Sequence, residues 1–196
     1  MSTVAIILAY DAGEGFDGPK YASVLAGKPL VSAVIDDALS WPVDEIVVVL
    51  GHDASGVIET IGPVLDHDKV SIVVDEGWSE GEASPLRAAL DLVSRDRSVQ
   101  TCVLARGDQP GVRAHDVSAL VEALEADQVM AAIPKYRYAS GWPIVLSQRA
   151  WGLFLGLEGG IDVRDILASH GAAITEVWID HLEPRRYRTA SDFDRF

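Results

Sequence analysis

The sequence predicts an α/β fold of three layers, in which a mostly parallel β-sheet is covered by helices on both faces. Several short, continuous apolar runs are typical of strands that are buried on both faces. Segments with apolar residues at helical spacing alternate with these runs, and Gly, Pro or Asp residues follow most of the runs. In such a sheet, ligands bind beyond the carboxyl ends of the strands.

Seven segments are predicted to be strands. The first covers residues 4–9 and reads VAIILA, with no polar residue to face solvent. The others are predicted over residues 45–51, 70–74, 101–104, 129–133, 143–146 and 173–179. The single cysteine, Cys102, lies within one of these strands, so we expect it to be a small core residue rather than a nucleophile.

Helices are predicted between these strands. The first begins after Pro29, which suits a first helical turn, and Trp41-Pro42 ends it. Ser84 is a good N-cap for a helix that continues to residue 93, with Pro85 at its first helical position. Further helices are predicted over 57–61 ahead of a turn at Gly62-Pro63, over 117–124, over 151–157 and from a cap at Asp162 to near Gly171, and Ser191 is expected to cap a final turn.

Composition limits the class of protein. A chain of 196 residues, 48% of them apolar, suffices for one well-buried domain and is too short for two, so we expect residues 1–196 to form a single domain. Its net charge of −14 excludes nonspecific binding to nucleic acid or to an anionic membrane, although a small pocket can still hold a nucleotide. No leader opens the sequence and no apolar run reaches the roughly 20 residues that span a bilayer. A cytoplasmic protein without a membrane partner is therefore expected.

A glycine-rich loop follows the first strand, with Gly13, Gly15 and Gly18 ahead of Lys20. Small residues let backbone N–H groups approach a phosphate closely, and a lysine adds positive charge. The loop also carries three carboxylates, which an anion would be expected to avoid. Its glycine spacing matches the dinucleotide fingerprint, but the next helix begins well after the glycines, so a nicotinamide or flavin site is not expected.

Further motifs follow along the chain in a fixed order. They are Leu8-Ala9 with Gly13 and Pro19-Lys20, Gly27-Lys28-Pro29-Leu30, residues 78–90, Gly107-Asp108-Gln109-Pro110, Gly141-Trp142-Pro143-Ile144, residues 157–167 with Arg164, and residues 186–193. In this order they resemble the motifs of the molybdopterin nucleotidyltransferase-like (MobA/MocA-like) family of NTP transferases. The resemblance spans nearly the whole chain, and the order of the motifs makes it specific, since no one motif would suffice.

The resemblance implies a Rossmann-like fold of the nucleotide-diphospho-sugar transferase type. It also implies transfer of a nucleoside monophosphate from CTP or GTP to a phosphorylated acceptor such as molybdopterin, with release of pyrophosphate, in molybdenum cofactor biosynthesis. Asp108 would bind a Mg²⁺ ion that bridges the triphosphate, and Lys20 would stabilise charge during transfer. The implied nucleotide-binding residues are Leu8, Ala9, Asp11, Gly13, Lys20, Asp75, Ser84 and Asp108. The residues alone also allow a structural role for each of these positions. Asp75 and Asp108 would then lie in turns, Lys20 in a solvated loop, and Ser84 at a plain N-cap.

Several positions depart from the family's pattern and reverse the expected polarity of the site. They are Tyr10, Asp11, Gly15 and Asp17 in the loop, Trp142 in a later segment, and Arg186 and Arg188 where the closing motif has acidic residues. In one hypothesis the protein is active: these two arginines, with Arg164, contact phosphate or an anionic acceptor, and the loop aspartates take over part of the metal binding. In another, the loop aspartates pair with the arginines in a catalytically silent nucleotide-binding or accessory protein. In a third, the arginines are solvated and never approach the loop.

Overall fold

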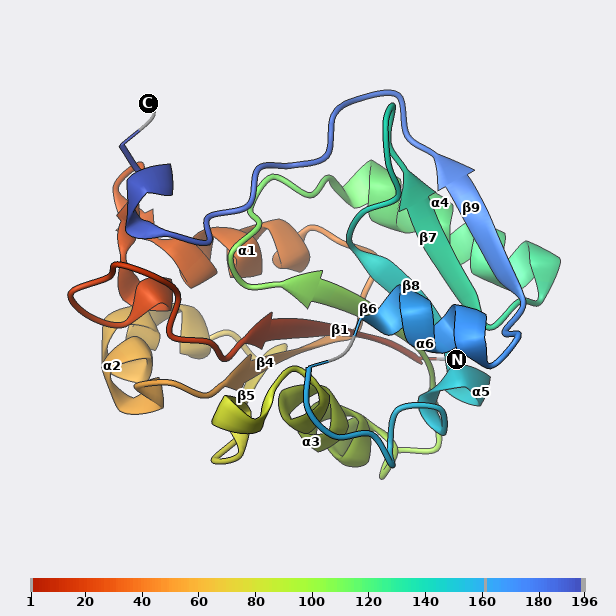
Figure 1. Cartoon of the computed structure of the whole chain (residues 1–196), viewed down its shortest axis with the longest axis horizontal. Helices are drawn as coiled ribbons and strands as arrows, with labels where there is room; N and C mark the ends of the chain where they lie inside the picture. The colour runs from red at the N-terminus through yellow and green to blue at the C-terminus, as the bar shows by residue number, and fades with distance from the viewer. Residues whose placement is uncertain (1, 161, 195–196) are drawn as a thin grey trace.

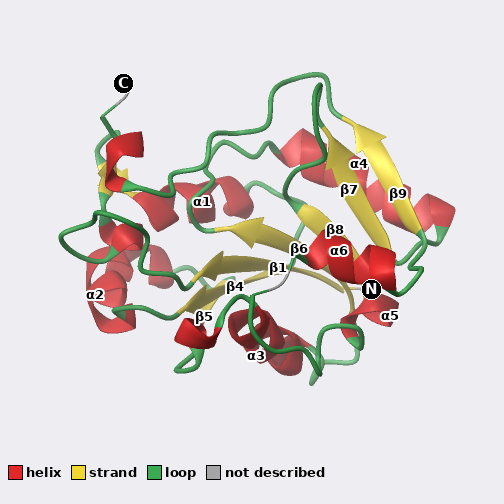
Figure 2. Ribbon diagram, viewed as in Figure 1, coloured by secondary structure: helices red, strands yellow, loops and turns green. Residues whose placement is uncertain are grey.

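The computed structural model describes residues 2–160 and 162–194, and its centre is a seven-stranded sheet with the strand order β5-β4-β1-β6-β8-β7-β9 (Figure 1, Figure 2). The strands are β1 (Ser2–Ala9), β4 (Glu45–Leu50), β5 (Val70–Val74), β6 (Val99–Arg106), β7 (Ala131–Lys135), β8 (Ile144–Ser147) and β9 (Ile174–Trp178). β8 runs antiparallel to both of its neighbours, and the other pairs are parallel. The predicted mostly parallel, mixed sheet is therefore confirmed.

Helices cover both faces of this sheet. They are α1 (Leu30–Leu39), α2 (Ala54–Leu65), α3 (Ala83–Val93), α4 (Ala114–Asp127), α5 (Gln148–Trp151) and α6 (Val163–Ser169), with single 3₁₀ turns at Lys20–Ala22, Trp78–Glu80 and Ala190–Asp192. A short hairpin of β2 (Val24–Leu25) and β3 (Lys28–Pro29) lies ahead of α1. No helix in the described part of the chain is long and apolar enough to cross a membrane.

The central strand β1 shows why the sequence forms three layers. Its residues point alternately to opposite faces, as in any strand. Ala5 and Ile7 pack in a core with α1, α2 and α4, whereas Val4 and Ile6 pack in a second core with α3, α5 and α6. All four side chains are buried, so the continuous apolar run reflects burial on both faces.

Two predicted helices differ from the observed ones. The turn predicted at Gly62-Pro63 does not end the second helix, because α2 continues to Leu65 with Pro63 in its last turn. Val64 and Leu65 pack against the core there, which compensates for the N–H that proline lacks. The helix predicted over 151–157 is observed earlier, as α5, and turns follow it.

Of the predicted helix caps, one is confirmed and two are wrong. Asp162 caps α6 as predicted, since its side chain accepts from the N–H of Arg164. α3 begins at Ala83, so Ser84 is not its N-cap. The last 3₁₀ turn is capped by Thr189 rather than Ser191. Cys102 is fully buried in the core, as expected.

Candidate functional site

The site lies beyond the carboxyl ends of β1 and β6, where Gly107 brings the two strands close. The Gly107 N–H donates to the Leu8 carbonyl at 2.8 Å. A Cβ atom at Gly107 would lie 2.6 Å from the Cβ of Ala9, so a larger residue does not fit. The next residue, Asp108, is therefore held directly over the end of β1, and it is only 1% exposed.

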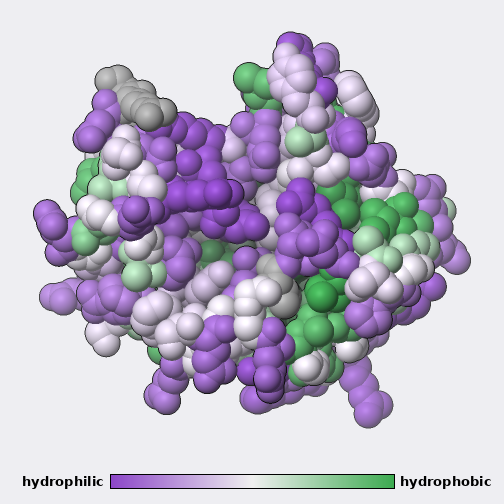
Figure 3. Space-filling view, in the orientation of Figure 1, coloured by the Kyte–Doolittle hydropathy of each residue, from purple (hydrophilic) through white to green (hydrophobic). Residues whose placement is uncertain are grey.

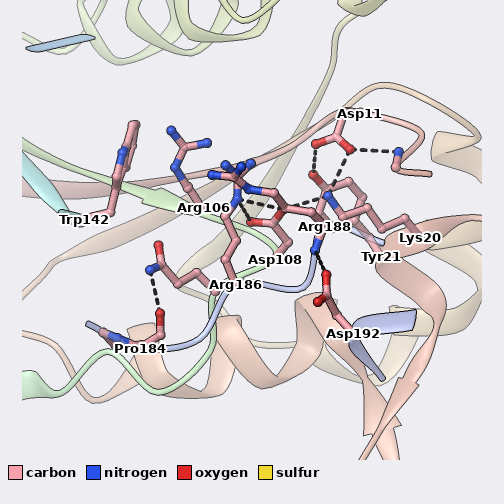
Figure 4. A network of polar contacts seen from close by, with 12 residues as sticks. Asp11, Lys20, Tyr21, Arg106, Asp108, Trp142, Pro184, Arg186, Arg188 and Asp192 are labelled. Carbon is pink, nitrogen blue, oxygen red and sulfur yellow. Dashed lines mark hydrogen bonds and ion pairs between the residues drawn. The ribbon is translucent and has the colours of Figure 1, made fainter. Parts of the chain in front are cut away.

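Asp108 is held between two cationic side chains (Figure 4). The Lys20 Nζ lies 2.6 Å from Oδ2 of Asp108. The Arg186 Nε donates to both carboxylate oxygens, at 2.9 Å to Oδ1 and 3.1 Å to Oδ2. An unpaired carboxylate at this depth would be costly, so these contacts are what allow Asp108 to be buried. The structure thus places the two predicted catalytic residues, Lys20 and Asp108, in direct contact.

Asp11 holds the glycine loop together instead of facing an anion unpaired. Its carboxylate accepts from Tyr21 Oη at 2.7 Å, from the Gly13 N–H at 2.8 Å and from Lys20 Nζ at 2.9 Å. Burial alone would raise the pKa of Asp11, but Lys20 and these hydrogen bonds outweigh it and lower the pKa below its usual value. The carboxylate that stands where the family has a glycine is therefore an internal anchor.

Gly13 lets the loop lie directly on the lysine. Its φ is +69°, which is unfavourable for other residues, and a Cβ there would lie 2.7 Å from Cδ of Lys20. Lys20 is only 2% exposed as a result. The predicted solvated-loop alternative for this lysine is therefore wrong.

The chain beyond β9 brings two arginines to this site, running back across the sheet toward the glycine loop (Figure 1). The Tyr187 N–H donates to the Asp108 carbonyl at 2.8 Å, and the Gln109 side chain donates to the Pro184 carbonyl at 2.8 Å. On the loop side, the Ala190 N–H donates to the Glu14 carbonyl at 3.0 Å. The two backbone contacts, from Tyr187 and Ala190, depend little on side-chain identity, whereas the third requires the Gln109 amide.

One of the three hypotheses expected ion pairs between the loop aspartates and the arginines of the C-terminal segment, and the observed pairs differ from it. Asp11 pairs with Lys20, and Arg186 pairs with Asp108. Asp17 is exposed and, within the described part of the chain, makes no ion pair. The hypothesis that Asp11 and Asp17 pair with Arg186 and Arg188 is wrong, and so is the solvated-run alternative for Arg186.

A polar pocket of about 340 Å³ opens beside Asp108. Its wall contains the arginines Arg106, Arg164, Arg186 and Arg188, together with Gln109 and Trp142. Hydrophilic side chains gather around the hollow on this face of the molecule (Figure 3). Four arginines around one small pocket are unexpected in a chain with a net charge of −14, and the pocket is therefore a candidate anion site.

The four arginines are not equally available to a ligand. Arg164 is committed to the wall, because it donates to Asp162 at 2.8 Å and to the Ser140 carbonyl at 2.9 Å. Arg106 lies 4.2 Å from the ring centre of Trp142, and burial together with Arg186 lowers its pKa.

Arg186 and Arg188 are the available pair. The terminal Nη groups of Arg186 have no hydrogen-bond partner among the described residues. The side chain of Arg188 is likewise unpaired within the described part of the chain, and its residue is exposed.

Asp75 and Ser84 form a second polar cluster at the end of β5. The Ser84 hydroxyl donates to Oδ1 of Asp75 at 3.0 Å, and the Gly77 N–H donates to the same oxygen at 3.2 Å. The other oxygen, Oδ2, is buried and has no partner among the described residues. A buried carboxylate oxygen of this kind calls for a hydrogen-bond donor from a ligand or water.

The predicted metal site on Asp108 does not fit the side chains around it. Both Asp108 oxygens already accept hydrogen bonds from cationic groups. Among the described residues, no group of three or more His, Cys, Asp or Glu side chains is placed to hold a metal ion. A divalent ion needs several oxygen ligands, and it would have to displace Arg186 or Lys20 to reach this carboxylate.

Sequence reasoning missed several residues of the site. Tyr21 anchors the glycine loop through Asp11, and Gln109 anchors the C-terminal segment through Pro184. The Glu82 Oε2 atom lies 3.9 Å from Nη1 of Arg106. Arg106 had one local signal, because it directly precedes the Gly107-Asp108 motif at the end of a strand. Gln109 and Glu82 lie inside the ordered motifs and Tyr21 directly follows Lys20, but which groups they contact depends on how the segments pack.

Comparison with known proteins places the chain in a family. The family model described as MobA-like NTP transferase domain matches residues 5–174. The bifunctional protein GlmU of Syntrophomonas wolfei is 30% identical over 171 residues, covering 84% of this chain and 36% of GlmU. The chain thus spans about a third of the length of this curated relative.

Two solved structures share the fold over almost the whole chain. The homologue of Mycobacterium tuberculosis Rv0371c from Mycobacterium sp. strain JC1 has a TM-score of 0.85 and 27% identity, covering 98% of this chain and 93% of that one. Rv0371c from M. tuberculosis H37Rv in complex with manganese has a TM-score of 0.80 and 24% identity, covering 99% and 96%.

Proposed function

This chain belongs to the MobA-like NTP transferase family, and from that premise we propose that it is a nucleotidyltransferase. It would transfer a nucleoside monophosphate from CTP or GTP to a small phosphorylated acceptor and release pyrophosphate. The observation that carries the proposal is the arginine-lined pocket beside the buried Lys20–Asp108 pair, in a protein that is otherwise strongly acidic.

The pocket suits phosphate groups. A guanidinium presents N–H donors in a planar fork that matches two phosphate oxygens at once. Arg186 and Arg188 both line the pocket with unpaired terminal groups in the described part of the chain, so they would contact phosphates of the nucleotide or of the acceptor. Arg164 would contribute mainly by shaping the wall, because its own donors are already used.

The reaction would be an in-line displacement at the α-phosphorus. An oxygen of the acceptor phosphate would form the new bond to phosphorus, and the bond to the departing pyrophosphate would break. Positive side chains placed in advance around the phosphates would stabilise the charge that develops. Positioning and charge therefore account for the chemistry, with little acid–base work for the protein.

The cluster at Asp75 would receive the nucleoside. Its buried Oδ2 lacks a partner among the described residues, and the amino groups of cytosine and guanine are both donors. Ser84 would orient this carboxylate through its 3.0 Å hydrogen bond. Adenine also carries an amino donor, so the choice of CTP or GTP rests on the family resemblance, and the cluster supports a base that presents a hydrogen-bond donor.

Molybdopterin is the acceptor that the family resemblance suggests, through its phosphate group, and molybdenum cofactor biosynthesis would be the corresponding pathway. The resemblance also suggests Mg²⁺, and one similar structure contains manganese. Because the side chains around Asp108 do not fit a divalent ion, no step of the proposed reaction is assigned to one.

The test is release of pyrophosphate. The protein is incubated with CTP or GTP and molybdopterin, with and without Mg²⁺, and compared with the Asp108→Ala variant. We expect pyrophosphate from one nucleotide with the wild type and a loss of at least about a hundredfold with the variant. Equal rates for the two proteins, or no release with either nucleotide, would contradict the proposed activity.

A second candidate function, nucleotide binding without catalysis, is favoured by the internal hydrogen bonds of Asp11 and Asp108. Asp11 and Asp108 are held by hydrogen bonds within the protein, so the fold could bind a nucleotide without turning it over. This silent protein would be stabilised by CTP or GTP, by about 2.7 kcal/mol at a hundred times the dissociation constant, yet release no pyrophosphate. The pair of measurements distinguishes the two functions.

A further inference from the structure

Arg186 is placed to fill two roles that belong, in many phosphate-binding sites, to a divalent ion. Such an ion neutralises a carboxylate on the protein and binds phosphate oxygens on its other side. The Nε of Arg186 already neutralises Asp108, at 2.9 Å and 3.1 Å from the two oxygens. Arg186 also lines the pocket, and its Nη groups have no partner among the described residues.

The surrounding charges keep this guanidinium in place. Burial alone would lower the pKa of Arg186, but Asp108 outweighs it and raises the pKa above its usual value. Lys20 sits on the opposite side of the same carboxylate, at 2.6 Å from Oδ2. The Tyr187 N–H donates to the Asp108 carbonyl, so the backbone next to Arg186 is fixed to the same residue.

The net charge of the group also favours an anion. Lys20 and Arg186 together carry two positive charges, and Asp11 and Asp108 carry two negative ones, so the buried core of the site is neutral. Arg188 adds a positive charge at the pocket that no described side chain neutralises. The pocket wall also contains one carboxylate, Glu183, whose Oε1 accepts from the Gln109 side chain and from the Trp142 N–H, so arginines outnumber carboxylates among the residues that line the pocket.

We propose that Arg186 takes the place of a divalent metal ion at Asp108, and that the pocket binds the phosphates of a nucleoside triphosphate without a divalent ion. The inference rests on the proposed function for the identity of the ligand, but it concerns binding and does not require turnover. It identifies Arg186 as a residue that determines metal independence.

The first experiment measures binding by titration calorimetry with the full chain. CTP, GTP and inorganic pyrophosphate are each titrated in EDTA and again in excess Mg²⁺. For the ligand that binds, we expect dissociation constants that agree within about threefold between the two conditions. The Arg186→Gln variant should weaken binding in EDTA by about tenfold or more, because a charge-assisted contact to phosphate is lost.

The second experiment asks whether removal of the arginine restores a metal site. Arg186→Asp places a second carboxylate beside Asp108, and binding of Mn²⁺ is followed by loss of the free-ion signal in electron paramagnetic resonance. We expect no Mn²⁺ binding at this site by the wild type, and binding by the variant, with nucleotide affinity that now depends on the metal. Arg97→Asp is the matched control, since it makes the same charge change at an exposed position near the opposite end of β6.

The outcomes separate this inference from the proposed function. Nucleotide binding that requires Mg²⁺ in the wild type overturns metal independence and leaves the transferase proposal standing. Absence of binding to any of the three ligands under both conditions overturns both. A thermal melt of each variant shows whether it is folded. If the Arg186→Asp variant is unfolded, the titration of Arg186→Gln alone decides whether Arg186 supports metal-independent binding.

Discussion

The Nε of Arg186 lies 2.9 Å from Oδ1 of Asp108, a carboxylate that is only 1% exposed. The two residues are far apart in the sequence, and Arg186 comes from a segment that crosses the carboxyl ends of the strands (Figure 1). The negative charge of Asp108, at the centre of the site, is therefore neutralised by a side chain of the protein itself.

The first prediction concerns the stability of this buried cluster. Asp108→Asn removes the charge that pairs with Lys20, which is 2% exposed, and with the more accessible Arg186. We expect the free energy of unfolding to fall by roughly 3 kcal/mol, since removal of one partner leaves a buried charge uncompensated. Urea denaturation measures it.

The control for this prediction is Asp17→Asn, at an exposed position without an ion pair in the described part of the chain. It should change the free energy of unfolding by no more than about 0.5 kcal/mol. Similar losses in the two variants would show that the buried pairs contribute little.

The second prediction concerns the close approach of β1 and β6. Gly107→Ala places a Cβ 2.6 Å from that of Ala9, so the strand ends must separate. We expect a loss of about 1–3 kcal/mol in the free energy of unfolding, and weaker nucleotide binding because Asp108 moves with the backbone. Gly152→Ala is the matched control, because Gly152 has open space around it and an ordinary helical φ. A loss in the control as large as in Gly107→Ala would contradict the steric explanation.

The third prediction concerns pH. The pKa of Asp11 is lowered from its usual value of 3.8, so the folded state favours the ionised carboxylate. The stability that this carboxylate contributes is fully present above about pH 4 and is lost as the pH falls through the lowered pKa. The difference in free energy of unfolding between wild type and Asp11→Asn should therefore be largest near neutral pH and shrink below pH ~4. A difference that stays constant down to pH ~2 would refute the role of its ionisation.

The fourth prediction tests the nucleoside cluster. Asp75→Asn replaces the buried, unpaired acceptor oxygen with a group that can donate instead. We expect the affinity for the preferred nucleotide to fall by about tenfold, whereas binding of inorganic pyrophosphate stays the same. The control is Asp91→Asn, at an exposed position on α3. Equal loss for nucleotide and pyrophosphate would place Asp75 at the phosphates rather than at the nucleoside.

Much of the fold could be predicted because its signals are local. The run Val4–Ala9 lies within β1 and is buried on both faces, since no polar side chain interrupts it. Predictions failed where packing overrides local preference. Pro63 stays within α2 because the residues after it reach the core. α3 begins two residues earlier than predicted, and the Ser84 side chain donates to Asp75 instead of capping the helix.

The candidate site divides in the same way. The sequence by itself predicted that Lys20 lies in a loop after the first strand and Asp108 at the end of a later one, and the family resemblance indicated that Arg186 and Arg188 stand where acidic residues are expected. Only the tertiary structure decided which charges meet: Asp11 binds Lys20 within the loop, and Arg186 binds Asp108 from the C-terminal segment. The physical reason is that an ion pair depends on distances of a few ångströms and on burial, which are set by how distant segments pack, whereas the residues alone specify only which charges are present.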